Sequence, residues 1–433
     1  MPVLEATITE LAPGGEGVAH VQIEGERRAV FVPQVLVGER VRVEADTSRR
    51  PARARALSVL QPSPERVTPE CPHVRSCGGC DWMHLSLAEQ MRCHASIVER
   101  LLPPELGAPE IVTHAPATTR GYRTRARLHV DAKRGHVRVG MFARRSRDPV
   151  EVSACLVLDP RLDEVRRKLG GWLEGSRGKG EAQIALGALG AVGAGADRRA
   201  VVDVRWSGDL PAAVFARFER ATLAGEIAGA RLFAGDVKVP ARIGDPTPWI
   251  LGADDLPLRL APGGFSQATE AGNRRLAERA ALLATTLEPA GPVLELFAGA
   301  GNLTVLLART RDVVAVEVDR DACDAARANL RDRGLSARVV TADAATYAIP
   351  RETRLVVLDP PRAGAKEVAA ALAARPHASI VYVSCDPPTL GRDLATLARA
   401  GYVATAVETF EMFPQTSHVE TVVALRAPRG DRR

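Results

Sequence analysis

The chain has 433 residues, of which 46% are hydrophobic and 25% charged, a composition typical of a protein with several globular domains. No run of 18 or more apolar residues occurs, which excludes a membrane-spanning helix. The first residues, MPVLEATITE, lack the features of a secretory signal, so we expect a cytoplasmic protein. The net charge of +6 favours a polyanionic partner. In such a chain, seven cysteines indicate metal-binding, catalytic or inert core thiols rather than disulfides.

Residues 1–60 alternate between apolar and polar positions in short runs that Gly-rich turns separate. The runs include EATITEL, VAHVQIEG, RAVFVP and GERVRVEA. This pattern predicts an N-terminal β-barrel domain of the OB type. The proline-bearing segment QPSPERVTPE then reads as a linker, and a compact cysteine-rich segment follows over residues 71–84.

Residues 61–245 predict a central domain of mixed α/β structure. Strands are expected in YRTRARLHVD (122–131), HVRVGMFARR (136–145), QIALGALGAV (183–192) and RAVVDVRWS (199–207). Helices are expected over residues 159–175 and 210–229.

Residues 246–433 predict a Rossmann-like α/β domain. Near-continuous apolar runs occur in PVLELFAGAGN, DVVAVEVD, ARVVTAD, RLVVLDPP and SIVYVSCD. Helical stretches such as RDACDAARANLRDRG lie between several of these runs. Buried strands that alternate with helices are typical of a doubly wound parallel sheet.

Three successive strand ends in this domain carry residues suited to a nucleotide cofactor. Gly299, Gly301 and Asn302 follow the first strand, and glycines there let the backbone approach a ligand at a helix N-terminus. Glu317 ends the next strand, at the usual distance for an acid that binds ribose hydroxyls. Asp343 ends the third, where it could hold an adenine amine. A dinucleotide fits these features, but DPPR after the fourth strand favours S-adenosylmethionine.

Five motifs occur in an order that resembles the RNA uracil-C5 methyltransferase family. They are GGFSQAT, LELFAGAGN, LDPPR, SCDPPTL and SHVET, and the resemblance covers almost the whole chain. The N-terminal barrel and the cysteines are similar to those of members that modify 23S rRNA, in which the barrel is called a TRAM domain and is implicated in RNA binding. The resemblance implies a monomeric, S-adenosylmethionine-dependent enzyme that methylates C5 of a uridine in 23S rRNA.

The chemistry of this reaction accounts for a reactive cysteine. Uracil C5 is a weak nucleophile, and a thiolate that adds to C6 converts the ring into an enolate that can attack a methyl group. Cys385 is the expected nucleophile, because it stands at the carboxyl end of a parallel strand. The resemblance implies that Glu420 is the general base and that Asp359 orients uracil or the methionine moiety. It also implies that Gln267 lies near the cofactor and the base, with Phe297 as an apolar neighbour.

Three positions depart from the family pattern. Asp386 follows Cys385 where the family usually has Asn, Thr269 stands where Asn is common, and Ala298 stands where Cys is common. None of these differences removes a catalytic group.

The cysteine-rich segment predicts a metal or iron–sulfur site. Cys71, Cys77 and Cys80 follow a C-x5-C-x2-C spacing, and their three thiolates could ligate a cluster. Zinc is the alternative, because His73 and His84 are nearby and Cys3His sites are common.

The resemblance implies a [4Fe–4S] cluster with Cys155 as its fourth ligand. Spacing alone does not distinguish Cys155 from Cys93. We expect Cys93 and Cys323 to be core or helix-face thiols.

Two stretches, RGYRTRARL (120–128) and FARRSRD (142–148), concentrate arginine beside an aromatic residue. They predict either an RNA-contacting surface, with guanidinium groups on phosphates and rings on bases, or solvated strand faces.

Three other functions stay open at this point. The enzyme could methylate a uridine in tRNA, or an exocyclic amine of RNA, since a D-P-P motif also serves that chemistry. It could instead be an RNA-binding protein with an inactive domain. Cys385 and Glu420 discriminate, because amine methylation needs no nucleophilic thiol.

Overall fold

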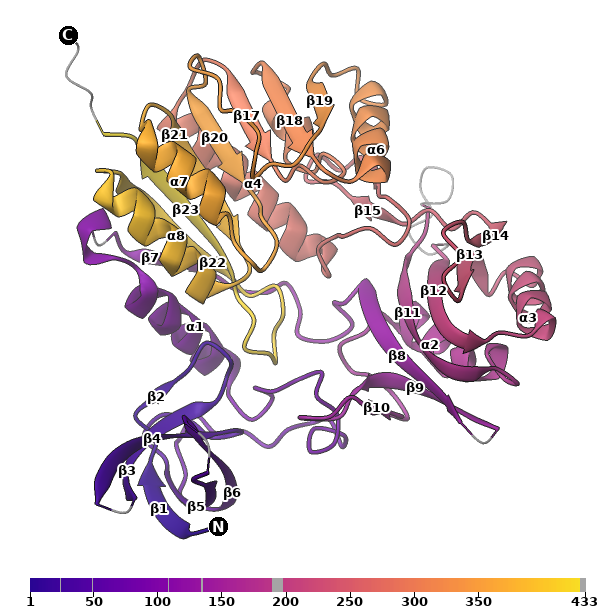
Figure 1. The fold of residues 1–433 in the computed structure, drawn as a ribbon, viewed down its shortest axis with the longest axis vertical. Helices are drawn as coiled ribbons and strands as arrows, with labels where there is room; N and C mark the ends of the chain where they lie inside the picture. The colour runs from indigo at the N-terminus through magenta and orange to yellow at the C-terminus, as the bar shows by residue number, and fades with distance from the viewer. Residues whose placement is uncertain (24, 49, 108, 134, 189–197, 429–433) are drawn as a thin grey trace.

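The computed structural model describes residues 1–433 apart from 24, 49, 108, 134, 189–197 and 429–433. Figure 1 shows a small N-terminal sheet, a central sheet and a C-terminal α/β layer around a common centre. The multidomain α/β architecture agrees with the expectation. No helix in the described part of the chain has the length and hydrophobicity to cross a bilayer.

The N-terminal sheet curls around its own core. Its six strands lie in the order β1-β5-β6-β4-β3-β2. They are β1 (Val3–Thr7), β2 (Glu10–Leu11), β3 (Gly17–Ile23), β4 (Glu26–Val32), β5 (Arg40–Asp46) and β6 (Ala52–Gln61). Val41 and Val43 of β5 are buried whereas Arg40 and Arg42 are exposed, the period of two that places one face of a strand inside. EATITEL contributes to two strands, β1 and β2, because Ile8 and Thr9 between them belong to neither.

The central sheet is covered by helices on one face only (Figure 1). Its seven strands lie in the order β10-β9-β8-β11-β12-β13-β14. They are β8 (Arg125–Lys133), β9 (His136–Phe142), β10 (Pro149–Val150), β11 (Arg177–Leu186), β12 (Ala200–Asp209), β13 (Ile227–Ala234) and β14 (Ala241–Gly244). The helices are α2 (Pro160–Trp172) and α3 (Ala212–Leu223). Leu128, Ile184, Val204 and Phe218 meet in the core between the two layers.

Two elements of this domain differ from the sequence expectation. The helix expected over 210–229 ends at Leu223, because Gly225 has φ of 74° and β13 begins at Ile227. The strand expected over 183–192 starts earlier, at Arg177, and ends at Leu186; residues 189–192 lie outside the described residues.

The C-terminal sheet confirms the expected Rossmann-like arrangement. Its eight strands lie in the order β19-β18-β17-β20-β21-β23-β22-β7. They are β7 (Ile111–His114), β17 (Val293–Leu296), β18 (Val313–Glu317), β19 (Arg338–Thr341), β20 (Leu355–Leu358), β21 (Ser379–Ser384), β22 (Val403–Phe410) and β23 (Glu420–Arg426). Strands β17 to β21 pair in parallel, whereas β23 runs antiparallel between β21 and β22. The carboxyl ends of the parallel strands therefore meet at one edge.

Helices connect these strands. They are α4 (Glu270–Leu287), α5 (Thr304–Leu307), α6 (Arg320–Arg331), α7 (Lys366–Ala374) and α8 (Pro387–Arg399). A ribbon of β15 (Trp249–Leu251) and β16 (Pro257–Arg259) precedes α4.

One segment that the sequence analysis placed in the central domain packs instead on the C-terminal sheet. Strand β7 pairs in parallel with β22, and α1 (Leu87–Leu101) lies beside α8. The 3-10 turn η1 (Pro104–Leu106), which links α1 to β7 in the chain, also contacts α8. Val98 and Leu106 join the same core cluster as Leu394 and Leu397. The apolar pattern of α1 shows that one face is buried, but it does not show which sheet covers that face.

Candidate active site

Cys385 lies where β21 passes into α8. The side-chain oxygen of Asp386 accepts a hydrogen bond from the Thr389 amide (2.9 Å) and caps the helix. Pro387 and Pro388 occupy the first turn, where a helix does not need backbone N–H donors. The prolines therefore start α8 two residues after Cys385. Because Asp and Asn both cap helices, the departure at Asp386 keeps this local structure.

Glu420 lies next to Cys385 at the edge of the sheet. It is the first residue of β23, and the register of β21 with β23 pairs Ser384 with Thr421. The Glu420 side chain is 2% exposed, and its Oε2 has no hydrogen-bond partner among the described residues. Burial, together with the nearby Asp359 carboxylate, raises the pKa of Glu420 to about 8.

The environment of Cys385 favours the protonated thiol. Burial first, and then the charge of Glu420, raise the pKa of Cys385 to about 12. The guanidinium of Arg362 opposes both effects. Asp359 follows β20 directly, and burial raises its pKa to about 7. The structure therefore places Cys385, Glu420 and Asp359 close enough for their charges to interact.

The loop after β17 has a backbone suited to close approach of a ligand. Phe297, Gly299 and Gly301 have φ of 64°, 55° and 83°, in the left-handed region. The Gly299 amide donates to Oε2 of Glu317 (2.9 Å), so this acid fixes the loop from the end of β18. The Asn302 and Asn273 side-chain amides donate to each other's oxygens at 2.9 and 3.1 Å, which joins the loop to α4.

Asp343 and Gln267 lie on either side of this loop in the sequence. Asp343 is exposed beyond β19, and its Oδ1 accepts from the Ala345 amide (2.9 Å). Gln267 is 7% exposed, and its Oε1 has no partner in the described structure. The segment that carries Gln267 is held on the central sheet by the Thr124 amide, which donates to the Ala268 carbonyl (2.8 Å).

Three further residues of the site were missed in the sequence. Glu295 is buried within β17, and burial raises its pKa to about 8; an acid inside the apolar run VLEL was the available signal. Arg362 lies 3.4 Å (Nη2 to Nε2) from His418 and is the cation of the LDPPR motif. Phe265 is 75% exposed two residues before Gln267, with the Arg125 guanidinium 5.6 Å from its ring.

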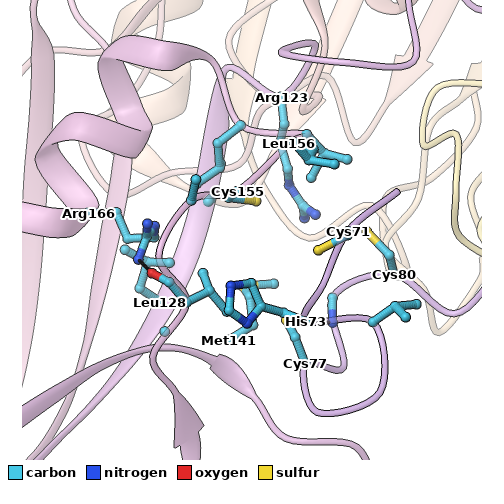
Figure 2. Close-up of a pocket in the computed structure, with 18 of the residues that line it drawn as sticks. Cys71, His73, Cys77, Cys80, Arg123, Leu128, Met141, Cys155, Leu156 and Arg166 are labelled. Carbon is cyan, nitrogen blue, oxygen red and sulfur yellow. Dashed lines mark hydrogen bonds between the residues drawn. The ribbon is translucent and has the colours of Figure 1, made fainter. Parts of the chain in front are cut away.

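A separate cavity brings four cysteines together (Figure 2). Cys71, Cys77, Cys80 and Cys155 line it, with apolar neighbours such as Leu128, Met141 and Leu156. Burial first, and then the other thiols, raise the pKa of Cys77, and raise that of Cys80 to about 12. Within the described ranges, no three His, Cys, Asp or Glu side chains are placed to hold a single metal ion.

The other candidate ligands are engaged elsewhere. Cys93 is buried on α1, with its thiol 3.2 Å from Oε1 of Glu89, and Cys323 is buried on α6. Nε2 of His84 lies 3.4 Å from the Val35 carbonyl oxygen of the N-terminal sheet, and burial lowers its pKa to about 4. His73 lines the cavity, but its Nε2 lies 3.0 Å from Oγ of Ser153. The structure thus places Cys155, and not Cys93, with the three clustered cysteines.

The arginine-rich stretches have more than one role. Arg144 donates to the carbonyls of Val74 (3.0 Å) and Cys80 and so supports the cysteine-rich segment. Arg125 donates to the Ser266 carbonyl (3.0 Å) beside Gln267. Arg127, by contrast, is 64% exposed, and it alternates along β8 with Ala126 and Leu128, which pack in the core with α2 and α3, so it lies on the opposite face of the sheet.

Comparison with known proteins places this site in a family. The family model described as tRNA (Uracil-5-)-methyltransferase matches residues 253–428. The chain is 35% identical to a 23S rRNA (uracil(1939)-C(5))-methyltransferase RlmD of Alkalilimnicola ehrlichii, over 99% of this chain and 97% of that protein. It is 36% identical to the protein of the same name in Halomonas elongata, over 99% and 90% of the two chains.

The fold as a whole is similar to a solved structure. The Pyrococcus abyssi tRNA (uracil-54, C5)-methyltransferase, in complex with S-adenosyl-L-homocysteine, superposes with a TM-score of 0.72 at 22% identity, over 97% of this chain and 99% of that chain. These comparisons confirm the resemblance that the five motifs indicated. The chain belongs to the family of S-adenosylmethionine-dependent RNA uracil-C5 methyltransferases.

Proposed function

We propose that this enzyme methylates C5 of a specific uridine in 23S rRNA through a covalent bond between Cys385 and C6. One observation carries the covalent mechanism: Cys385 and Glu420 lie at adjoining strand ends, beside a half-buried Asp359. The names of the relatives, which refer to uracil 1939 of 23S rRNA, support the choice of substrate.

Cys385 and Glu420 have complementary tasks in this mechanism. The Cys385 thiol loses its proton to water, its Sγ bonds to C6, and the C5–C6 π electrons move toward O4 as an enolate. S-adenosylmethionine, when bound, would supply the electrophilic methyl group for C5, and breaking of its S–CH3 bond would leave S-adenosyl-L-homocysteine. Glu420 then accepts the proton from C5, the C5–C6 double bond re-forms and the Sγ–C6 bond breaks. The free enzyme is restored when Glu420 releases that proton.

The electrostatics suit these tasks. Glu420 has a pKa of about 8, so its anion is basic enough to accept a carbon-bound proton near neutral pH. Arg362 favours the anions of both Cys385 and Glu420, so it stabilises the thiolate when it forms. Asp359 is available to orient the uracil ring or the methionine moiety.

The residues around the loop after β17 fit S-adenosylmethionine. The cofactor carries a sulfonium and an ammonium cation. The carboxyls of the buried Glu295 and the half-buried Asp359 have pKa values raised to about 8 and about 7. A bound cation beside them would stabilise their anions. The orphaned Oε1 of Gln267 is available as an acceptor.

The remaining contacts would come from four positions of the loop and two strand ends. We propose that Glu317 and Asp343 bind the ribose and adenine, and that Phe297, Gly299, Gly301 and Asn302 enclose the cofactor.

The test uses Cys385→Ala with Cys93→Ala as a matched control. Cys385→Ala is expected to abolish methylation while binding of S-adenosylmethionine and RNA persists, and Cys93→Ala to behave as wild type. RNA with 5-fluorouridine at the target should trap the wild-type enzyme as a denaturation-resistant adduct, because fluorine cannot leave as a proton. Near-normal methylation by Cys385→Ala would refute the covalent mechanism and favour methylation of an exocyclic amine. Failure of the wild type to bind S-adenosylmethionine would favour a non-catalytic RNA-binding protein.

We further propose that Cys71, Cys77, Cys80 and Cys155 hold a [4Fe–4S] cluster. The support is a donor set of four thiols around one largely apolar cavity. A cluster has a ligand at each corner, so its cysteines stand farther apart than the ligands of one ion. The engagement of His73 and His84 elsewhere weakens the zinc alternative.

The N-terminal sheet, residues 1–61, is proposed to be a TRAM domain that binds RNA. Its exposed Arg40, Arg42 and Arg55 on neighbouring strands β5 and β6 suit a phosphate backbone. We propose that the enzyme acts as a monomer in the cytoplasm, where its RNA substrate is made.

A further inference from the structure

The loop between β22 and β23, residues 411–419, is held by parts of the chain that are far away in sequence. The Ser417 amide donates to Oδ1 of Asp81 (2.9 Å). The Trp82 amide donates to the Gln415 carbonyl (3.0 Å). The loop leads directly into Glu420, so these contacts lie within a few residues of the proposed base.

Gln415 has an unfavourable backbone conformation that hydrogen bonds hold in place. Its φ of 75° is in the left-handed region, which is unfavourable for a residue with a side chain. The Gln90 side chain compensates, because its Oε1 accepts from the Gln415 amide (2.7 Å) and its Nε2 donates to Oε1 of Gln415 (3.2 Å). A conformation of this kind persists only where its surroundings impose it. The loop thus takes its shape from α1 and from the segment that follows the cysteines.

The N-terminal domain packs where the segment that follows the cysteines meets loop 411–419. The Trp82 indole N–H donates to the Gly15 carbonyl (3.0 Å). A Cβ on Gly15 would lie 2.5 Å from Oδ2 of Asp81 and 2.7 Å from Cβ of Ser417, so only glycine fits. The contact that holds Ser417 is therefore buttressed by a second domain.

We propose that Asp81 is a positioning residue for the base: it couples the cysteine-rich segment to Glu420 through loop 411–419. Asp81 directly follows Cys80, and Ser417 precedes Glu420 by three residues. The shape of the cysteine-rich segment therefore determines where the start of β23 lies. This inference rests on the proposed covalent mechanism, and it assigns a role to the first residue of the SHVET motif.

The test compares Asp81→Ala with Asp81→Asn. Alanine removes the acceptor for the Ser417 amide, whereas asparagine keeps an oxygen there. Asp81→Ala is expected to lower turnover about tenfold, the effect of losing a hydrogen bond to a charged group. Because removal of the C5 proton is the step affected, a denaturation-resistant enzyme–RNA adduct should accumulate on ordinary RNA. Affinity for S-adenosylmethionine should not change, and Asp81→Asn should restore turnover.

Further variants separate this role from general damage. Asp245→Ala removes an exposed carboxylate that accepts from the Thr247 amide (3.0 Å) and does not contact the loop, and it should behave as wild type. If Asp81→Ala does not fold, Gln90→Ala tests the positioning of the same loop, because Gln90 holds Gln415. This variant should also accumulate the adduct. Wild-type turnover without adduct in either folded variant would overturn the proposal, as would equal impairment of Asp81→Asn and Asp81→Ala. If instead the wild type fails to form an adduct with 5-fluorouridine RNA, the covalent mechanism itself is wrong.

Discussion

Replacement of Glu420 by Gln is expected to stabilise the folded enzyme, and to do so increasingly as the pH rises. In the folded state the pKa of Glu420 is about 8, because burial and the Asp359 charge disfavour its anion, whereas its usual value is 4.5. Between these two values the unfolded carboxyl is ionised and the folded one is protonated. The unfolded state then binds fewer protons, so the wild type loses stability as the pH rises. A neutral glutamine does not titrate.

The size of the effect follows from the two pKa values. One pKa unit corresponds to about 1.4 kcal/mol. The difference in unfolding free energy between Glu420→Gln and wild type should therefore grow by roughly 3 kcal/mol from pH 4.5 to pH 7 and by roughly 4 kcal/mol up to pH 8 and above, where it levels off. The change with pH is the diagnostic quantity, because the buried glutamine amide adds a contribution that does not depend on pH.

The assay is urea denaturation of both proteins at several pH values between 5 and 9, with Glu408→Gln as a matched control. Glu408 is equally buried, in β22, but hydrogen bonds from Arg279 and His114 outweigh burial and lower its pKa. Its carboxylate therefore stabilises the fold above its unfolded pKa, and this contribution is lost as the pH falls through the folded pKa. Glu408→Gln should be destabilising at neutral pH, the opposite sign. A stability difference for Glu420→Gln that stays constant between pH 5 and 9 would mean that Glu420 is ionised throughout in the folded enzyme, and the reasoning would be refuted.

Four other outcomes are expected. Single-turnover methylation should become faster as the pH rises toward 8, because Glu420 must be anionic to accept the C5 proton; a flat profile between pH 6 and 8 would contradict this. Anaerobically purified enzyme should be brown and contain iron and sulfide, which Cys155→Ala should lose and Cys93→Ala should keep; a colourless protein with one bound zinc would exclude the cluster. RNA affinity should fall as salt rises, since phosphate neutralisation releases counterions. Deletion of residues 1–61 should weaken RNA binding but not binding of S-adenosylmethionine, and unchanged RNA affinity would argue against the TRAM assignment.

The C-terminal fold and the place of Cys385 at a strand end could be predicted from the sequence alone. The hydrophobic periodicity of short segments predicts buried parallel strands and the helices between them. Residues at the carboxyl ends of such strands meet at one edge of the sheet whatever the details of packing. Cys385, Glu317 and the glycines at 299 and 301 could therefore be placed from the motifs alone. The expected alternation in the N-terminal sheet has the same local origin.

Features that depend on contacts between residues far apart in the chain became visible only in the tertiary structure. Sequence spacing could not choose Cys155 over Cys93, because that choice depends on which distant segment packs against the cysteine-rich segment: the loop before α2 brings Cys155 to the cavity, whereas Cys93 is buried on α1. The apolar stripe of α1 did not indicate that it packs beside α8. The acid Glu295 lay unnoticed in an apolar run, and the Asp81–Ser417 hydrogen bond joins residues 336 positions apart. Contacts of this range leave no periodic signal in the sequence, because they are fixed by how whole domains pack against one another.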